Sequence, residues 1–268
     1  MTETFDRLGY GTYKLTDPEE CVSGIRHAIE TGYRHVDTAQ MYDNESSVGE
    51  AIADASVDRD NLFVATKLDT DALDYDDAVR TATESRDRLG IDTIDLLYVH
   101  WPIGTYDPDE TLPALDHLAD EGVIDRVGLS NFRPDQLETA MDRLDADLFA
   151  HQVECHPLCP QERLREVAVE NDHWLVAYSP IARNRVADVD VLREIAAKHD
   201  ATPAAVSLAW LLSKDRVAPI PKAASHEHVE ANWAARDLDL DDEDLDRIDA
   251  IDRRERVVDF EAAPWNQI

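Results

Sequence analysis

The sequence of 268 residues predicts an α/β fold, a single (β/α)8 TIM-barrel domain over residues 1–268. Short apolar runs recur about every 25–35 residues, and a longer segment with helical spacing follows each run. No linker rich in proline, glycine or serine divides the chain. Strands and helices are predicted to alternate over the whole length. This pattern is compatible with two folds, an open doubly wound sheet and a closed barrel.

Seven of the apolar runs are rich in valine, isoleucine and leucine and predict strands that are covered on both faces. They span residues 34–36, 62–66, 94–99, 123–129, 148–153, 174–177 and 217–220. A barrel needs an eighth strand, for which residues 9–15 are the candidate. Gly9 and Gly11 begin the G-x-G-x-x-G pattern of a dinucleotide-binding sheet, but Lys14 occupies the third glycine position and no helix follows directly. The barrel is therefore the predicted fold.

Helix-start signals separate the strands. Asp17 with Pro18, and Thr202 with Pro203, place a capping side chain before a proline suited to the first helical position. Amphipathic helix interiors are predicted at residues 84–89, 112–119, 136–144, 162–168 and 191–197. The acidic run 237–246 is interpreted as the solvated start of a further helix, where carboxylates suit the positive end of the helix dipole.

The composition is strongly acidic, with 58 Asp and Glu against 26 Lys and Arg, a formal charge of -32 and a pI near 4.4. Such a surface repels phosphate backbones and anionic lipid, so nucleic acid and membranes are excluded as partners. The acid comprises 38 Asp and 20 Glu, and the base comprises 21 Arg and only 5 Lys. This bias resembles proteins of salt-loving microbes, and an ordinary acidic cytoplasmic protein is the alternative.

Three cysteines, Cys21, Cys155 and Cys159, are too few for a disulfide scaffold, so a reducing cytoplasm is the expected setting. The first residues carry acid and lack the apolar run of a signal peptide, and no run of about 18 apolar residues predicts a membrane span.

Polar residues follow the predicted strands in unbroken succession: Asp37, Lys67, His100, Ser130 with Asn131, Gln152, Tyr178 and Lys222. Each one alone has an ordinary explanation, because polar residues are common in turns. Because the carboxyl ends of all barrel strands meet at one face, the full set predicts a functional site there.

Asp37, Lys67 and His100 come from three neighbouring strands, and Tyr42 lies in the loop after Asp37. A tyrosine hydroxyl has an ordinary pKa near 10, and a nearby Lys67 ammonium would lower it. A buried lysine would in turn need a carboxylate such as Asp37, and His100 could steer a carbonyl oxygen toward the hydroxyl. These residues could move a proton on or off a carbonyl or alcohol oxygen.

The chain resembles the aldo-keto reductase family through an ordered set of motifs. The set is GYGTYKL, GYRHVDTAQMYDNE, LFVATKL, DLLYVHWP, VGLSNF, HQVECHP, VAYSP and IPKAASHEHVEAN, and it covers nearly the whole chain. The family's fold is the barrel predicted above. The resemblance implies that Tyr42 is the general acid in reduction, that Asp37 and Lys67 tune it, and that His100 orients the substrate carbonyl.

The resemblance also implies a nicotinamide cofactor, NADPH, at the same face. Its contacts would come from Thr12, Ser130, Asn131, Gln152, Tyr178, Ser179, Pro180, Ile181, Lys222, Ala223, Ser225, His228 and Asn232. Ser130, Asn131 and Gln152 would hold the carboxamide and Tyr178 would stack on the ring. The loop from Ser179 onward would follow the pyrophosphate, with Arg183 or Arg185 as possible ligands or as solvated loop charges.

Two departures from the family pattern concern the adenosine 2'-phosphate. Lys222 would meet this group, but Ala223 and His228 replace the Ser and Arg that are common in NADPH-dependent members. Losing a hydroxyl and a fixed positive charge weakens phosphate binding. The expectation is NADPH use with relaxed preference, so that NADH also serves.

Tyr13 and Trp101 would line the substrate pocket, by resemblance. The loop 103–109 is short and only residues 257–268 follow the last predicted helix, so few residues are left to shape a selective pocket. A small-molecule carbonyl substrate is expected, and a broad aldehyde and ketone reductase is the predicted function. Short microbial members of the family act on sugar-derived dicarbonyls, and the chain resembles these diketo-gluconate and aldehyde reductases. A monomer is the expected state.

The sequence leaves three other interpretations of the site. A nucleotide-binding regulatory protein on the same barrel would lack turnover, and an isomerase or aldolase would use Lys67 as a Schiff-base nucleophile. The third, a metal site, draws on residue types at His151, Cys155, His156 and Cys159. Zinc sites of this kind usually need a second ligand pair, and the same stretch supplies Gln152, so no metal is expected.

The charge makes a prediction about salt, because NADPH is itself an anion. At about 1 M salt the Debye length shrinks to about 3 Å, so only charges in contact act on the cofactor. Lowering the KCl concentration is expected to lower the melting temperature and to weaken NADPH binding together. An unchanged melting temperature and full activity in dilute buffer would contradict a salt-adapted surface.

Overall fold

The eight strands form one parallel sheet in the order β1 to β8, wrapped into a nearly closed barrel. A computed structural model describes residues 5–267. The strands are β1 Gly9–Gly11, β2 His35–Asp37, β3 Phe63–Leu68, β4 Leu96–Val99, β5 Val127–Ser130, β6 Leu148–Glu154, β7 Trp174–Tyr178 and β8 Val217–Pro219. The predicted (β/α)8 barrel is confirmed.

Two glycines let the first strand approach the last one. The Gly11 N–H donates to Pro221 O at 3.1 Å, just beyond β8. A Cβ atom at Gly11 would lie 2.9 Å from Ile220 O, and one at Gly9 would lie 2.8 Å from the Ile220 side chain. Larger residues would push β1 away from β8. The glycines that begin a dinucleotide motif therefore serve barrel closure.

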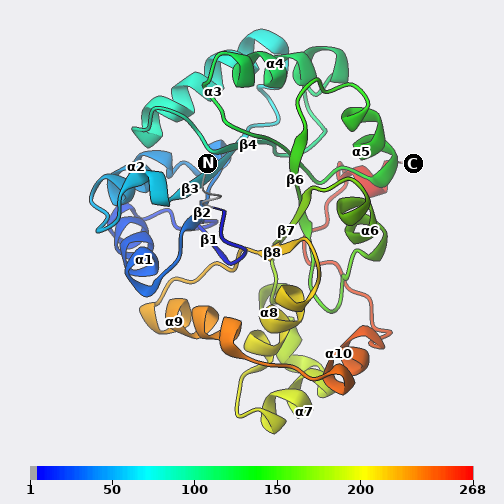
Figure 1. Cartoon of the computed structure of the whole chain (residues 1–268). Helices are drawn as coiled ribbons and strands as arrows, with labels where there is room; N and C mark the ends of the chain where they lie inside the picture. Colours follow the sequence, from blue (N-terminus) through cyan, green and yellow to red (C-terminus); the bar gives the residue numbers. More distant parts are fainter. Residues whose placement is uncertain (1–4, 268) are drawn as a thin grey trace.

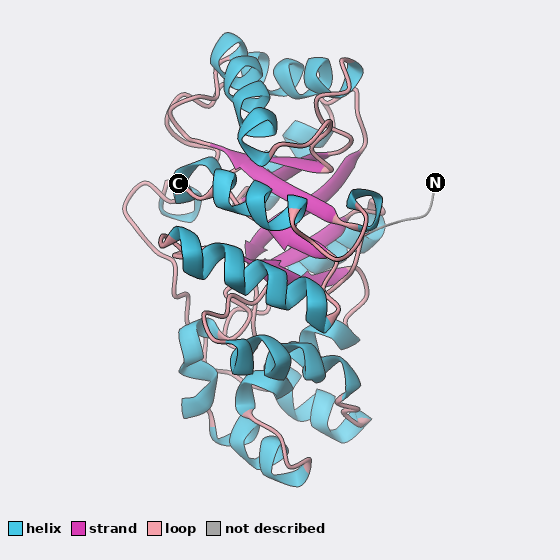
Figure 2. Cartoon of the chain, turned by 90° about the vertical axis from the view of Figure 1, so that its left-hand side faces the viewer, coloured by secondary structure: helices cyan, strands magenta, loops and turns pink. Residues whose placement is uncertain are grey.

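The helices surround the ring of strands (Figures 1 and 2). They are α1 Pro18–Thr31, α2 Glu45–Ala53, α3 Tyr75–Leu89, α4 Pro108–Asp120, α5 Pro134–Met141, α6 Glu162–Glu170, α7 Asp190–Lys198, α8 Pro203–Ser213, α9 His226–Ala234 and α10 Asp242–Asp249. Asp17 caps α1 by accepting the Glu20 N–H at 3.0 Å, and Thr202 caps α8 by accepting the Ala205 N–H at 3.1 Å. Within residues 5–267, no helix is long and apolar enough to cross a membrane.

The acidic run starts a helix, as interpreted: Asp241 caps α10 by accepting the Asp244 N–H at 2.9 Å, and Asp242 and Glu243 in the first turn are exposed. One carboxylate of the run is buried instead of solvated. Asp244 in α10 is 1% exposed and accepts from the Lys198 ammonium at 2.9 Å and from the His199 ring at 2.6 Å. Its carboxylate ties α10 to the end of α7. A buried carboxylate needs such partners because burial removes it from water.

Several strand boundaries were also predicted wrongly. β5 begins at Val127, and the residues before it contribute an isolated bridge between Ile94 and Ile124. β3 continues through Leu68, so Lys67 lies inside the strand and not beyond it. β6 ends at Glu154, one residue past the predicted run 148–153, and Gln152 lies inside it. The ladder hydrogen bonds continue past the apolar run because the polar side chains find partners inside the barrel.

Side chains of alternate strand residues fill the barrel interior. Phe63, Ala65, Leu96, Tyr98, Ala150, Val176, Ala218 and Ile220 form a buried cluster separate from the larger apolar cluster that includes the helices. Phe5 packs against this cluster, with its ring 5.0 Å from those of Phe63 and Trp174. Because successive side chains point to opposite faces, Lys67 continues the inward row of Phe63 and Ala65. The polar residues are thus the top layer of a packed interior.

Candidate active site

A buried ion pair lies at the centre of the polar layer. The Lys67 ammonium donates to Asp37 Oδ1 at 2.5 Å and to Thr38 O at 2.6 Å, and its side chain is fully buried. Gln152 Nε2 donates to the other carboxylate oxygen, Asp37 Oδ2, at 2.7 Å. Burial lowers the pKa of Lys67, while Asp37 acts to raise it. One oxygen of Asp37 therefore accepts from a charged ammonium, and the other accepts from a neutral amide.

Tyr42 stands beside this pair, at the end of the short helix η1 Gln40–Tyr42. The Lys67 ammonium lies 5.2 Å from the centre of its ring, and the ring of His100 lies 5.8 Å away at 78°. The expected lowering of the Tyr42 pKa by Lys67 is wrong for this chain. Burial raises the pKa of Tyr42 well above its ordinary value, and the Asp37 charge raises it further. Tyr42 is therefore a neutral phenol at neutral pH.

His100 follows β4 and is 7% exposed. Burial lowers its pKa well below the ordinary value, and the neighbouring Lys67 lowers it further. His100 is therefore neutral at pH 7 and can donate one N–H. Its carbonyl oxygen accepts from Asn131 Nδ2 at 3.0 Å, which links β4 to the residue after β5.

Asn131 connects the next group of predicted residues. Its backbone has a φ of 65°, and its Nδ2 also donates to Ser130 Oγ at 3.0 Å. The Tyr178 hydroxyl donates to Asn131 Oδ1 at 2.8 Å. Tyr178 is fixed through its hydroxyl while its ring is only partly buried. The barrel thus brings Ser130, Asn131, Gln152 and Tyr178 together, as predicted.

Thr12 directly follows β1, across the barrel from Ser130 and Asn131 at the end of β5. Its hydroxyl and its N–H both donate to Asp37 O, at 3.1 and 3.0 Å. Thr12 is fully buried, and the neighbouring Tyr13 is 45% exposed with its ring 5.2 Å from that of Tyr42. Tyr13 therefore borders the entrance beside Tyr42.

The loop after β7 adopts an irregular backbone. Ser179 has a φ of 48°, and Ala182, Arg183 and Asn184 have φ values of 49°, 50° and 71°. Ser207 Oγ donates to Pro180 O at 2.6 Å, and Ile181 is partly buried. Arg185 forms an ion pair with Glu255, so it is not a free anion ligand. Arg183 is exposed.

The segment after β8 carries the remaining predicted cofactor residues. Lys222 is partly buried, and within residues 5–267 it forms no ion pair. Ser225 caps α9 by accepting the His228 N–H at 3.3 Å, while the His228 side chain is exposed. Ala223 is 3% exposed, with its carbonyl oxygen accepting from the Tyr10 hydroxyl at 2.7 Å, and Asn232 is buried in α9. Lys222 and His228 are thus the side chains with free polar ends.

The C-terminal tail packs on Trp101, a contact that the sequence did not indicate. Trp101 packs against Phe260 and Trp265, with ring centres 4.9 and 5.6 Å apart, and is only 8% exposed. Arg133 holds this tail through Pro264 O at 2.9 Å. The expectation that the short tail leaves few residues to shape a pocket is therefore corrected. Two aromatic residues, Phe260 and Trp265, in the short tail were the available signal.

The cysteine and histidine cluster is divided between other partners. His151 Nε2 accepts the Phe132 N–H at 3.2 Å, and burial lowers the pKa of His151 to about 3. His156 Nε2 lies 2.9 Å from Glu154 Oε1, with both side chains fully buried. No group of three or more His, Cys, Asp or Glu side chains among residues 5–267 is arranged to hold a metal ion.

Comparisons with known proteins agree with this architecture. The family model described as the aldo/keto reductase family matches residues 7–253. The chain is 34% identical over 268 residues to the methylglyoxal reductase DkgB of Salmonella typhimurium, covering 98% of this chain and 100% of that protein. It is 34% identical over 250 residues to the glyoxal reductase of Bacillus subtilis, covering 93% and 90%.

Solved structures show the same likeness. The crystal structure of a putative 2,5-diketo-D-gluconic acid reductase B superposes with a TM-score of 0.91 at 32% identity, covering 96% of this chain and 92% of that one. A thermostable aldo-keto reductase, Tm1743, gives a TM-score of 0.86 at 34% identity, covering 92% and 95%. The chain belongs to the aldo/keto reductase family and is an oxidoreductase enzyme.

Proposed function

We propose that this enzyme reduces small aldehydes and ketones to alcohols with NADPH or NADH as the hydride source. One observation carries the proposal. A neutral, buried Tyr42 phenol lies beside the Asp37–Lys67 pair and a neutral His100, at the C-terminal face of the barrel. The printed names of the relatives, methylglyoxal reductase and glyoxal reductase, favour a small dicarbonyl as substrate.

In the proposed reaction, Tyr42 donates its hydroxyl proton to the substrate carbonyl oxygen. The neutral His100 donates a hydrogen bond to the same oxygen and orients it. Asp37 holds Lys67 in place, and the ammonium near the ring stabilises the phenolate that forms. A bound nicotinamide would supply the hydride to the carbonyl carbon. Trp101 and the tail that covers it exclude water from one side of the pocket.

The residues present fit a nicotinamide cofactor. A carboxamide needs donors and acceptors beside a ring face. Asn131 accepts from the hydroxyl of the partly exposed Tyr178 and donates to Ser130, and Ser130 lies opposite Gln152 in the neighbouring strand. The loop from Ser179 would follow the pyrophosphate, and Lys222 would meet a 2'-phosphate. Further contacts with the cofactor would complete the proposed site. They would come mainly from backbone atoms of Thr12, Pro180, Ile181, Ala223, Ser225 and Asn232.

The primary test is direct. The protein is mixed with NADPH and methylglyoxal in concentrated KCl, and the nicotinamide absorbance is followed. Loss of absorbance with formation of the alcohol is the expected result. Tight NADPH binding without turnover across a panel of aldehydes would instead favour the regulatory protein.

Cofactor preference gives a separate prediction. Because Ala223 and His228 offer neither a side-chain hydroxyl nor a fixed positive charge, the ratio of kcat/KM for NADPH and NADH is expected to be below about ten. His228→Arg is expected to raise this ratio about tenfold, since a charge-assisted hydrogen bond contributes about 1.5–3 kcal/mol. A wild-type ratio well above ten, unchanged in the variant, would contradict relaxed preference.

The position of Lys67 argues against an isomerase or aldolase that forms a Schiff base. The Lys67 nitrogen already donates to Asp37 and Thr38 and is fully buried, so it is not placed to attack a carbonyl carbon. We further propose a monomeric, cytoplasmic and salt-adapted enzyme. Free thiols at Cys21, Cys155 and Cys159 suit a reducing compartment.

A further inference from the structure

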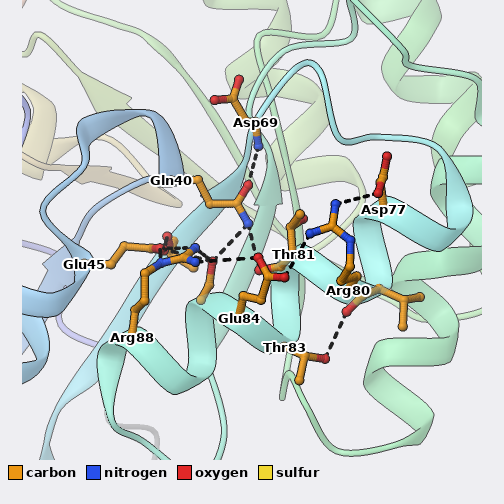
Figure 3. A network of polar contacts seen from close by, with 12 residues as sticks. Gln40, Glu45, Asp69, Asp77, Arg80, Thr81, Thr83, Glu84 and Arg88 are labelled. Atoms are coloured by element: carbon orange, nitrogen blue, oxygen red, sulfur yellow. Dashed lines mark hydrogen bonds and ion pairs between the residues drawn. The ribbon is translucent and has the colours of Figure 1, made fainter.

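Five side chains form a polar network between α2 and α3, outside the barrel. They are Gln40, Glu45, Thr66, Ser85 and Arg88, hereafter the α2–α3 network (Figure 3). At its centre the carboxylate of Glu45, 2% exposed, accepts from Thr66 Oγ1 at 2.5 Å, from Arg88 Nε at 2.8 Å and from Ser85 Oγ at 3.2 Å. Its charge is thus balanced by one guanidinium and two hydroxyls.

Ser85 joins the two halves of the network. Its hydroxyl oxygen accepts from Gln40 Nε2 and from Arg88 Nη2, each at 2.9 Å, while it donates to Glu45. Gln40 Nε2 also donates to Thr81 O at 3.0 Å, and Gln40 Oε1 accepts the Asp69 N–H at 2.7 Å. Each polar atom of Gln40 therefore has a partner, so its backbone position is closely determined.

The network brackets Tyr42 along the chain. Gln40 precedes Tyr42 by two residues and Glu45 follows it by three. Between them the Tyr42 N–H donates to Ala39 O at 3.1 Å, and Asp43 turns the chain with a φ of 53°. On the inner side the loop is held by Asn44, whose Oδ1 accepts from Thr38 Oγ1 at 2.6 Å. The backbone of Tyr42 is therefore anchored from both sides.

The Tyr42 side chain lacks an anchor of its own. Among residues 5–267 its hydroxyl has no hydrogen-bond partner, and its ring meets the rings of Tyr13 and His100. The location of the hydroxyl consequently follows the backbone of the loop. An error of about 1 Å in placing a reacting group can lower a rate about 100-fold.

The same network reaches the strand that carries Lys67. Thr66 and Lys67 are neighbours in β3, so their side chains point to opposite faces, Thr66 toward Glu45 and Lys67 toward Asp37. α3 can approach because α2 has Gly49 at the crossing, where a Cβ would lie 2.5 Å from Leu89 O. The last turn of α3 is therefore linked through Glu45 to the loop that carries Tyr42, and through Glu45 and Thr66 to the strand that carries Lys67.

We propose that the α2–α3 network positions Tyr42, with Glu45 and Arg88 as its principal positioning residues. This inference rests on the proposed function, in which Tyr42 is the proton donor. Arg88 is 39% exposed and touches no part of the pocket, so it acts through Glu45 and Ser85. Its loss leaves the Glu45 carboxylate buried with only hydroxyl partners, and the loop that carries Tyr42 relaxes.

The test compares Arg88→Met with Arg80→Met. Arg80 lies on the same helix and pairs with Asp77 at 2.5 Å and Glu84 at 2.9 Å (Figure 3). Among residues 5–267 it forms no hydrogen bond to Glu45 or Ser85, and it is linked to Arg88 through the exposed carboxylate of Glu84, which lies 3.9 Å from the Arg88 guanidinium. For Arg88→Met, kcat with methylglyoxal is expected to fall at least about tenfold, with KM and the NADPH Kd within about twofold of wild type. The Tyr42 amide is expected to exchange faster with solvent. Arg80→Met should match the wild type in all four quantities.

Each other outcome has a defined meaning. Equal kcat in the two folded variants, with only the melting temperature of Arg88→Met lowered, would show a structural role and overturn the proposal. Arg88→Lys, which keeps the charge, should recover part of kcat. Should Arg88→Met not fold, Ser85→Ala removes only one hydroxyl, and an unchanged kcat in that variant overturns the proposal.

The proposed function can fail separately. In that case the wild type itself shows no turnover with NADPH and any aldehyde tested. Amide exchange then still decides the positioning role, because it needs no reaction. Identical Tyr42 exchange in wild type, Arg88→Met and Ser85→Ala would refute the anchoring.

Discussion

Replacing Tyr42 with phenylalanine is expected to lower kcat for methylglyoxal reduction about 10³-fold. General acids contribute about 10² to 10⁴ in rate. Among residues 5–267 the hydroxyls of Tyr42 and Tyr98 are both unpaired beside the Asp37–Lys67 pair, but Tyr98 is fully buried inside the barrel, whereas Tyr42 lies in the loop after β2. Phenylalanine keeps the ring contacts with Tyr13 and His100 and gives up no hydrogen bond to the protein. Steady-state kinetics, NADPH titration and thermal melting of the variant measure the effect.

The variant's NADPH Kd and melting temperature should remain close to those of the wild type. A matched control is Tyr13→Phe, which removes a hydroxyl from the adjacent, 45% exposed ring and should change kcat by less than about threefold. Because burial raises the pKa of Tyr42 far above neutrality, the wild-type kcat for reduction should be constant through the neutral range. Near-normal turnover by Tyr42→Phe would exclude Tyr42 as the proton donor.

Replacing Lys67 with methionine is expected to destabilise the fold by about 3–5 kcal/mol and to abolish turnover. Removing one partner of a buried pair leaves the other charge without compensation, and Asp37 is 2% exposed. Gln152 would still donate to Asp37, but an amide does not neutralise a carboxylate. Urea unfolding in concentrated KCl, followed by tryptophan fluorescence, measures the loss.

The double variant Asp37→Asn with Lys67→Met separates stability from chemistry. It removes both charges, so it should recover much of the free energy of unfolding while remaining inactive. Lys214→Met is a control at a partly buried ion pair outside the barrel, since Lys214 pairs with the exposed Asp249. A single Lys67→Met variant as stable as the wild type would mean that the Asp37 charge is not buried in solution.

The fold was largely predictable because its signals are local. Apolar runs, capping residues and their spacing located all eight strands and most helices, and the count of strands selected the barrel over the open sheet. The end of β3 was not predictable in this way. Hydrophobicity marks a strand only while its residues are apolar, whereas Lys67 continues the ladder as a polar residue paired inside the barrel.

The site was predictable in its membership but not in its energetics. Residues that follow parallel strands must meet at one face, so the sequence identified Asp37, Lys67, His100 and Gln152 together. The direction of the Tyr42 pKa shift was predicted wrongly, because it depends on how far burial outweighs the nearby ammonium. That balance is a property of the surrounding packing.

Long-range contacts were decided by the tertiary structure alone. The sequence by itself determined the barrel, the family motifs and the acidic charge, because each follows from short sequence segments or from the composition. Only the folded chain brings Trp265 onto Trp101 and places Arg88 of α3 on Glu45 of α2. Such pairs are separated by 43 to 164 residues (88 − 45 and 265 − 101), and their meeting follows from how the helices and the tail pack on the barrel.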